Sequence, residues 1–342
     1  MFARAMSPGR FLFSALCSIG FLHAQQTGVS GPIAGFTFDA PTRSIRAVIG
    51  SLGSASLGPP IIEQLEFASI APRQNYAIAF HGGQPVLVSG LGAGKPSTRV
   101  LPVSGSCPEG VAWSNDGSAV VLYSKTQGWI QPFTGLPDSV TSTQPLSLVS
   151  LGGALSAVAT GPHGQPIAIG ITGNHAGVYV ITGANITPLL EASGPTALVF
   201  SDDGSVLYAL DQVSKQVFQS GISPSGGTNS PVQTWPLGLD DAISIQPARD
   251  ASNRQVLYVA GRTDRLLVVF DGSSHQSMAQ MPLSFEPTTL SPLGSNGFLL
   301  RPRSADGDPL WSVSFRPEPA VYFVPAAPVS NPLERRRGVL EQ

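Results

Sequence analysis

Phe200-Ser201-Asp202-Asp203-Gly204 repeats, with small changes, a phrase that stands 87 residues earlier, Trp113-Ser114-Asn115-Asp116-Gly117. An apolar run follows each copy, Ala119–Tyr123 after the earlier one and Val206–Leu210 after the later one. Half of this interval is close to the length of one propeller blade, and a weaker copy lies between the two, Thr160-Gly161-Pro162-His163-Gly164. The period predicts a repeat fold in which each unit packs only against its neighbours.

The chain divides into seven such units, which start near residues 31, 63, 107, 153, 194, 240 and 286. The clearest unit predicts four strands, at Thr196–Phe200, Val206–Leu210, Gln216–Ser220 and Val232–Leu237. Four strands in about 45 residues is typical of a propeller blade. We therefore predict an all-β fold, a seven-bladed β-propeller of four-stranded antiparallel blades. Six or eight blades are the alternatives, because the first unit is compressed.

The composition agrees with many short strands joined by tight turns. Charged residues make up 12% of the chain and hydrophobic residues 42%, which excludes a disordered protein. Glycine (38) and proline (31) are frequent, and no helical periodicity persists after residue 25. The last strand, Ala320–Val324, is expected to pair with the first unit around Ile33–Phe38 and to close the ring.

The N-terminus has the pattern of a secretory signal peptide. Arg4 and Arg10 supply positive charge, and the apolar stretch Phe11–Leu22 is too short to span a bilayer. We predict a signal peptide over residues 1–24, an N-terminal linker over 25–30, the propeller over 31–326 and a flexible C-terminal tail over 327–342. A periplasmic or secreted protein follows, with an uncleaved anchor as the alternative.

Charge and cysteine content narrow the partners of the mature chain. Loss of Arg4 and Arg10 leaves 17 of the 19 basic residues against 21 acidic ones, a net charge of −4. This balance disfavours nucleic acid and anionic lipid as partners. Cys107 becomes the only cysteine, so no intrachain disulfide is expected. We interpret this thiol as buried or inert. We expect a monomer with no membrane span after cleavage.

Known chemical motifs are absent or incomplete. The stretch Ser89–Ser97 resembles a phosphate loop, but Ser89 replaces the first glycine and Pro96 the metal-binding hydroxyl. There is no Gly-x-Ser-x-Gly elbow and no calcium loop, and the histidines lack metal-ligand spacing. The sequence thus predicts no catalytic residue, no metal and no cofactor.

One polar position recurs in register. We align the units on the residue that ends the first strand, Ile70, Trp113, Thr160, Phe200, Ile245 and Leu290. Four residues earlier each unit has an acid or a hydroxyl: Glu66, Glu109, Ser156, Thr196, Asp241 and Glu286. First strands line the axis of a propeller, so these side chains are expected at one mouth of the channel.

Two interpretations of this arc stay open. Polar groups at a strand start can cap backbone amides of neighbouring segments. Alternatively, converging carboxylates attract a cation or a basic partner, and close carboxylates raise one another's pKa values. On this second interpretation the partner is a protein or a small ligand, and a cationic one suits the carboxylates of the arc.

The phrase Phe-Ser-Asp-Asp-Gly-Ser at 200–205, followed by alternating apolar residues, resembles the TolB-like and surface-layer-like repeats of bacterial propellers, distant relatives of WD-repeat proteins. The resemblance spans residues 31–326 and implies an exported propeller used for binding; it transfers no catalytic residue. We therefore predict a non-enzymatic binding or protein-interaction scaffold of the cell envelope or the exterior. The alternative is a propeller hydrolase or lactonase that uses an acidic channel-mouth site.

Overall fold

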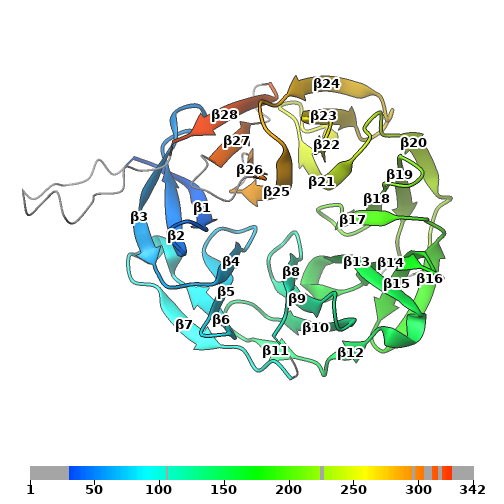
Figure 1. Cartoon of the computed structure of the whole chain (residues 1–342), viewed down its shortest axis with the longest axis horizontal. Helices are drawn as coiled ribbons and strands as arrows, with labels where there is room; N and C mark the ends of the chain where they lie inside the picture. Colours follow the sequence, from blue (N-terminus) through cyan, green and yellow to red (C-terminus); the bar gives the residue numbers. More distant parts are fainter. Residues whose placement is uncertain are drawn as a thin grey trace, which may run out of the picture. The chain divides into compact units, whose positions relative to one another are not determined.

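The structure, a computed structural model, describes residues 31–104, 107–223, 227–294, 297–303, 310–314 and 318–325. These residues form seven antiparallel sheets arranged in a ring, so the predicted seven-bladed β-propeller is confirmed (Figure 1). In each blade the first strand lies nearest the axis and the last strand at the rim. The predicted signal peptide, N-terminal linker and C-terminal tail fall outside the described residues.

The first three blades begin close to the predicted unit starts. Their strands are β1 (Ile33–Asp39), β2 (Ser44–Ile49) and β3 (Ser56–Ile62); β4 (Phe67–Ile70), β5 (Tyr76–His81), β6 (Gln84–Ser89) and β7 (Ser97–Val100); and β8 (Gly110–Trp113), β9 (Ala119–Ser124), β10 (Trp129–Thr134), β11 (Thr141–Ser142) and β12 (Leu146–Ser147).

The last four blades have four strands each. They are β13 (Gly153–Thr160), β14 (Ile167–Gly173), β15 (Gly177–Thr182) and β16 (Asn185–Leu190); β17 (Pro195–Phe200), β18 (Val206–Asp211), β19 (Gln216–Gly221) and β20 (Gln233–Pro236); β21 (Ala242–Arg249), β22 (Gln255–Gly261), β23 (Leu266–Asp271) and β24 (Ser277–Pro282); and β25 (Pro287–Leu293), β26 (Gly297–Pro302), β27 (Leu310–Ser314) and β28 (Ala320–Val324).

Short 3-10 turns complete the secondary structure of the described residues: η1 (Leu52–Ser54), η2 (Leu91–Ala93), η3 (Val149–Leu151) and η4 (Pro162–Gly164). None of the helices in this part of the chain is long and apolar enough to cross a membrane. The glycine-rich stretch after Ser89 is a connection that contains η2 and leads into β7.

Two blades depart from the four-strand pattern. Among the described residues, blade one has only β1, β2 and β3. In blade three the outer edge is divided, and β11 and β12 both pair with β10. Pro145 stands between these two short strands, and a proline has no amide hydrogen to donate to the ladder.

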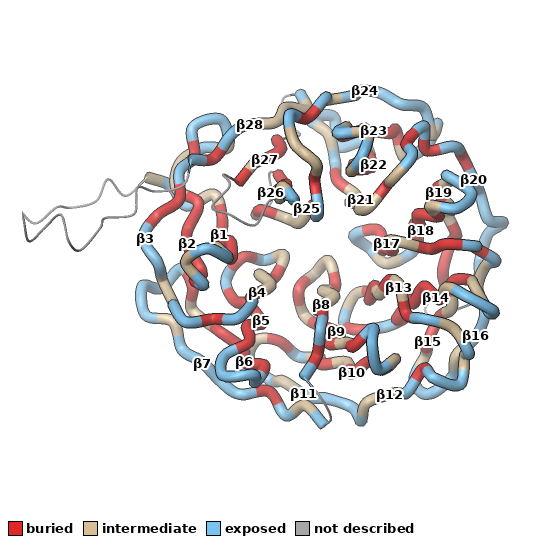
Figure 2. The backbone as a smooth tube through the Cα atoms, viewed as in Figure 1, coloured by how far each residue is buried: buried red, intermediate tan, exposed pale blue. Residues whose placement is uncertain are grey.

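The core is distributed over the blade interfaces. The buried residues form seven hydrophobic clusters in the described part of the chain, and each cluster joins two neighbouring blades. Middle strands are accordingly almost wholly buried, whereas rim strands such as β7 and β24 are largely exposed (Figure 2). Each blade therefore depends on both of its neighbours for burial of its faces.

The ring closes in a different way from the expected one. Strand β28 pairs with β27 as the rim strand of blade seven, whereas Ile33–Phe38 pairs with β2 at the axis. The expected pairing of Ala320–Val324 with Ile33–Phe38 is therefore wrong, since the two segments lie at opposite edges of their blades. Closure comes from side chains, because Val324 packs with Leu57 in one buried cluster.

Candidate functional site

All six polar residues predicted in register lie directly before or within the first strand of their blade. Four acids directly precede a strand: Glu66 before β4, Glu109 before β8, Asp241 before β21 and Glu286 before β25. Thr196 is the second residue of β17, and Ser156 is the fourth of the eight residues of β13. Equivalent strands run the same way along the axis, so we call this end of the channel, defined by these six residues, the entrance mouth.

The first two acids bind the hairpin that follows the second strand of their own blade. The Glu66 carboxylate accepts a hydrogen bond from the Gly82 amide at 2.9 Å and stays 42% exposed. Glu109 accepts one from the Ser124 hydroxyl at 2.7 Å and two from backbone amides, those of Lys125 and Thr126. The Ser124 hydroxyl, together with these amides, lowers the pKa of Glu109.

The other two acids pair with arginines. Asp241 lies 3.1 Å from Nε of Arg262, accepts a hydrogen bond from the Gln212 amide at 2.9 Å, and is 15% exposed. Glu286 pairs with Arg303 at 3.2 Å and with Arg265 at 3.6 Å. Carboxylates and guanidinium groups are therefore paired at the entrance mouth.

The two hydroxyls link neighbouring blades. Ser156 donates to the carbonyl of Pro195 at 2.5 Å, and Thr196 donates to the carbonyl of Ala242 at 3.3 Å. Each hydroxyl thus reaches the start of the next blade's first strand. This arrangement orients the side chains and leaves their oxygens able to accept a further hydrogen bond.

β-Bulges interrupt the first strands near the entrance mouth. The pairing of the first and second strands skips one residue in blades four to seven, at Ser156, Thr196, Ile243 and Thr288. Asp241 and Glu286 stand two residues before these skips, whereas Ser156 and Thr196 are the skipped residues themselves. Bulges of this kind re-aim side chains and are frequent beside functional sites.

The bulged residues meet in one pocket. A cavity of about 330 Å³ at the entrance mouth is lined by residues from five blades: Lys125, Ser156, Thr196, Gln212, Ala242, Ile243, Arg262 and Thr288. Of the predicted residues, Ser156 and Thr196 line it. Asp241 does not line the pocket itself but binds two lining residues, Gln212 and Arg262, and Glu109 binds the backbone amide of Lys125. Glu66 and Glu286 are not among the lining residues.

Lys125, Gln212 and Arg262 were missed by the sequence analysis. Each is the residue directly after the second strand of its blade, following Ser124 of β9, Asp211 of β18 and Gly261 of β22. An alignment of the units on the ends of their second strands, in addition to their first strands, would have placed these three residues at one equivalent position. The hairpins there bring these three side chains over the axis.

Lys125 and Arg262 are the charged groups that line the pocket. The Lys125 amine donates to the carbonyl of Ser156 at 2.5 Å. Desolvation lowers the pKa of Lys125, and the nearby Glu109 carboxylate opposes this shift. The Arg262 guanidinium is oriented by Asp241, which lies 3.1 Å from its Nε. The pocket therefore combines an amine with a lowered pKa, a guanidinium and several hydrogen-bonding groups.

Two other expectations concern ligands and thiols. Within the described residues, no group of three or more His, Cys, Asp and Glu side chains is placed to hold a metal ion. Cys107 is exposed, so the buried alternative for this thiol is wrong, and its sulfur contacts only the carbonyl of Pro108 among the described partners.

Comparison with known proteins supports the fold class. No family model matches the chain, and no curated protein is similar to it in sequence. Among solved structures, the periplasmic gluconolactonase PpgL of Pseudomonas aeruginosa is similar with 17% identity and a TM-score of 0.54, over 86% of this chain and 98% of that one.

Two further structures are similar to a comparable degree. A candidate 6-phosphogluconolactonase from Bacteroides uniformis has 14% identity and a TM-score of 0.55, over 85% of this chain and 95% of that one. A dihydro-heme d1 dehydrogenase has 15% identity and a TM-score of 0.55, over 86% of this chain but only 64% of its own length. At these identities the likeness shows a shared propeller fold.

The comparisons correct the expected function. The similar propellers are mostly enzymes, which contradicts the prediction of a non-enzymatic scaffold. None of them supports the finer resemblance to TolB-like or WD-repeat propellers, which stays a prediction.

Proposed function

We propose that the protein is a propeller hydrolase that opens a small anionic lactone or ester at the entrance mouth. The observation that supports this most strongly is the convergence of Lys125 and Arg262 on one pocket of about 330 Å³. A cavity of this size holds a small molecule. Because both charged lining residues are cations, we propose an anionic substrate in place of the cationic ligand expected from the acid arc.

The proposed reaction uses Lys125 as the general base. In its neutral form the amine takes a proton from water, and the water oxygen bonds to the acyl carbon while the carbonyl electrons move onto oxygen. The Arg262 guanidinium stabilises this oxyanion. The ester C–O bond then breaks, the leaving alkoxide takes the proton back from the Lys125 ammonium, and a hydroxy acid is released.

The acids of the entrance mouth act as positioning residues in this proposal. Asp241 orients both Arg262 and Gln212, and Glu109 holds the hairpin that carries Lys125. Removal of either acid is expected to disturb the pocket without removing a reacting group. Of the residues predicted in register, Asp241 and Glu109 thus bind residues of the pocket lining, while Ser156 and Thr196 line it directly.

The test is hydrolysis of glucono-1,5-lactone and of its 6-phosphate, which differ in charge but not in the reacting ring. We expect faster turnover of the phosphorylated lactone, and a loss of about hundredfold in kcat for Lys125→Met, the range that general base catalysis contributes. Since the neutral amine is the active form, kcat should rise with pH through a pKa below that of ordinary lysine.

Lys215→Met is the matched control, because Lys215 also follows a second strand by a few residues but pairs with Asp240 outside the pocket. It should retain wild-type turnover. Wild-type activity in folded Lys125→Met, or no hydrolysis of either lactone by the wild-type protein, would contradict the proposal. Export of the chain stays a prediction; of the three similar structures described, one is named as periplasmic.

A further inference from the structure

A second pocket lies at the opposite end of the channel. Its volume is about 600 Å³, and its lining comes from the ends of first strands and the turns after them in blades two, three, five, six and seven. We call this end the turn mouth, defined by Arg73, Asn115, Asp202 and Arg249. Residues of five blades meet here, so the pocket lies where these blades converge around the axis.

Part of the wall of this pocket is apolar. Three prolines line it, Pro72, Pro247 and Pro292, together with Ala248 and the buried ring of Phe298. Prolines offer rigid apolar surface with no amide hydrogen to satisfy. This wall suits the body of an organic molecule.

Two arginines stand on the same lining. Arg73 is exposed, and it makes no hydrogen bond or ion pair with any described residue. An added Cβ at Gly117, where φ is +71°, would lie 2.9 Å from the Tyr76 hydroxyl and 3.3 Å from Cγ of Arg73. Arg73 lines the pocket without a hydrogen-bond or ion-pair partner among the described residues, so its guanidinium is available to a ligand.

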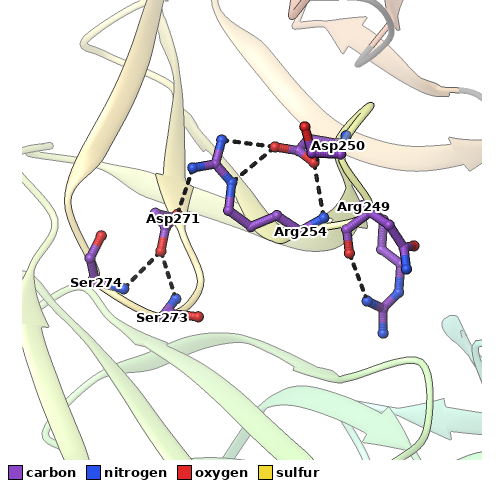
Figure 3. Close-up of polar contacts among 8 residues, drawn as sticks. Arg249, Asp250, Arg254, Asp271, Ser273 and Ser274 are labelled. Carbon is purple, nitrogen blue, oxygen red and sulfur yellow. Dashed lines mark hydrogen bonds and ion pairs between the residues drawn. The ribbon is translucent and has the colours of Figure 1, made fainter.

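Arg249 is held in place by its own hairpin. Its Nη1 donates to the carbonyl of Asn253 at 3.1 Å, and its Nε lies 3.8 Å from the half-exposed Asp202 carboxylate. Two other acids of this blade, Asp250 and Asp271, already form ion pairs with Arg254 (Figure 3). Figure 3 shows the Arg249 guanidinium directed away from that network.

Carboxamides fix the walls across blade boundaries. Asn115 donates to the carbonyl of Phe200 at 2.7 Å, a contact between blades three and five. Gln246 donates to the carbonyl of Leu290 at 3.3 Å, from blade six to blade seven. The pocket is therefore formed before any ligand arrives, which lowers the entropic cost of binding.

We propose that the turn mouth binds a small organic carboxylate with an apolar body, with its carboxylate between Arg73 and Arg249 and its body against the prolines. The lining carries two cations and one anion, so it favours a monoanion. Guanidinium groups bind planar carboxylates well because their donors match both oxygens. This site is independent of the hydrolase proposed for the entrance mouth.

Isothermal titration of the full chain with benzoate, and with neutral benzamide of the same shape, tests the proposal. We expect saturable benzoate binding at least tenfold tighter than benzamide binding. Arg73→Gln and Arg249→Gln should each weaken benzoate binding about tenfold. Asp202→Asn should strengthen it a few-fold, because it removes a negative charge and frees Arg249.

One variant serves as the control. Arg99→Gln removes an exposed arginine of the rim strand β7 and should bind benzoate like the wild type. Equal affinities for benzoate and benzamide, no saturable binding, or unchanged binding in folded Arg73→Gln would each overturn the proposal. Lactone hydrolysis is measured separately, so failure of one proposal leaves the other testable.

Discussion

At the scale of single residues, the repeated phrase forms a turn that is stabilised by hydrogen bonds among its own side chains and backbone amides. In blade five the Asp203 carboxylate accepts bonds from the Ser201 hydroxyl and from the amide and hydroxyl of Ser205, at 2.7 to 3.0 Å. In blade three Asp116 accepts the same pair of bonds from Ser118. Gly204 follows with φ at +72°, which favours glycine.

Asp203→Ala should destabilise the protein by about 1–3 kcal/mol, since it leaves several hydrogen bonds to a charged group unmade. Asp202→Ala is the matched control in the same turn. Asp202 is 60% exposed and its contact with Arg249 is long, so its loss should change the free energy of unfolding by less than about 1 kcal/mol. Urea unfolding of both variants checks this, and equal losses would contradict it.

At the scale of elements, carboxylates at strand ends hold the hairpins of blade six. Asp271 ends β23 and accepts hydrogen bonds from the amides of Ser274 and Ser273, at 2.7 and 2.9 Å (Figure 3). Its other oxygen lies 3.3 Å from Arg254, which bridges to Asp250. The Ser274 and Ser273 amides, followed by the Arg254 charge, lower the pKa of Asp271.

A lowered folded-state pKa means that the ionised form stabilises the fold. This stabilisation is fully present above the unfolded pKa of about 3.9 and is lost as the pH falls through the lower folded value. Asp271→Asn should therefore cost about 1–2 kcal/mol at pH 7, and the difference from the wild type should shrink below about pH 4.

Thermal unfolding between pH 3 and pH 7 measures this effect. Ser273→Ala is the control, because it keeps the backbone amide that Asp271 accepts from and should follow the wild-type pH profile. A constant difference between Asp271→Asn and the wild type over this range would show that the charge of Asp271 has no part in stability.

At the scale of the whole molecule, the ring is closed by packing between blades one and seven. Val324 of β28 is fully buried with Leu57 and Leu310. The backbone contact across this seam is a long one, from the Leu57 amide to the Pro325 carbonyl at 3.5 Å. A side-chain seam of this kind depends on β28 remaining in place.

A chain that ends at Pro319 lacks β28 and exposes the edge of β27, so it should lose several kcal/mol of stability and gain a tendency to associate through that edge. A chain that ends at Pro325 keeps β28 and should melt with the full-length protein. Differential scanning calorimetry compares the two. Equal melting temperatures for both truncations would show that the seam does not need β28.

Much of the fold followed from the sequence because the repeat is local. Ser201, Asp203, Gly204 and Ser205 form their turn with one another, and the apolar run of β18 comes directly after it. Such contacts are a few residues apart, so the same letters give the same turn wherever they occur. The blade count, the strand positions and the axial place of the first strands could therefore be predicted.

The entrance pocket and the seam were decided by contacts between distant segments. The bulges at Ile243 and Thr288 each add one unpaired residue to the first strand, two positions before Ile245 and Leu290, and no local pattern marks them. Lys125 and Arg262 meet over the axis although 137 positions separate them, because the ring returns equivalent hairpins to one end. The sequence by itself determined a ring of seven blades. Only the tertiary structure decided which side chains face each other across its channel, because that depends on bulges and on the rotation from blade to blade.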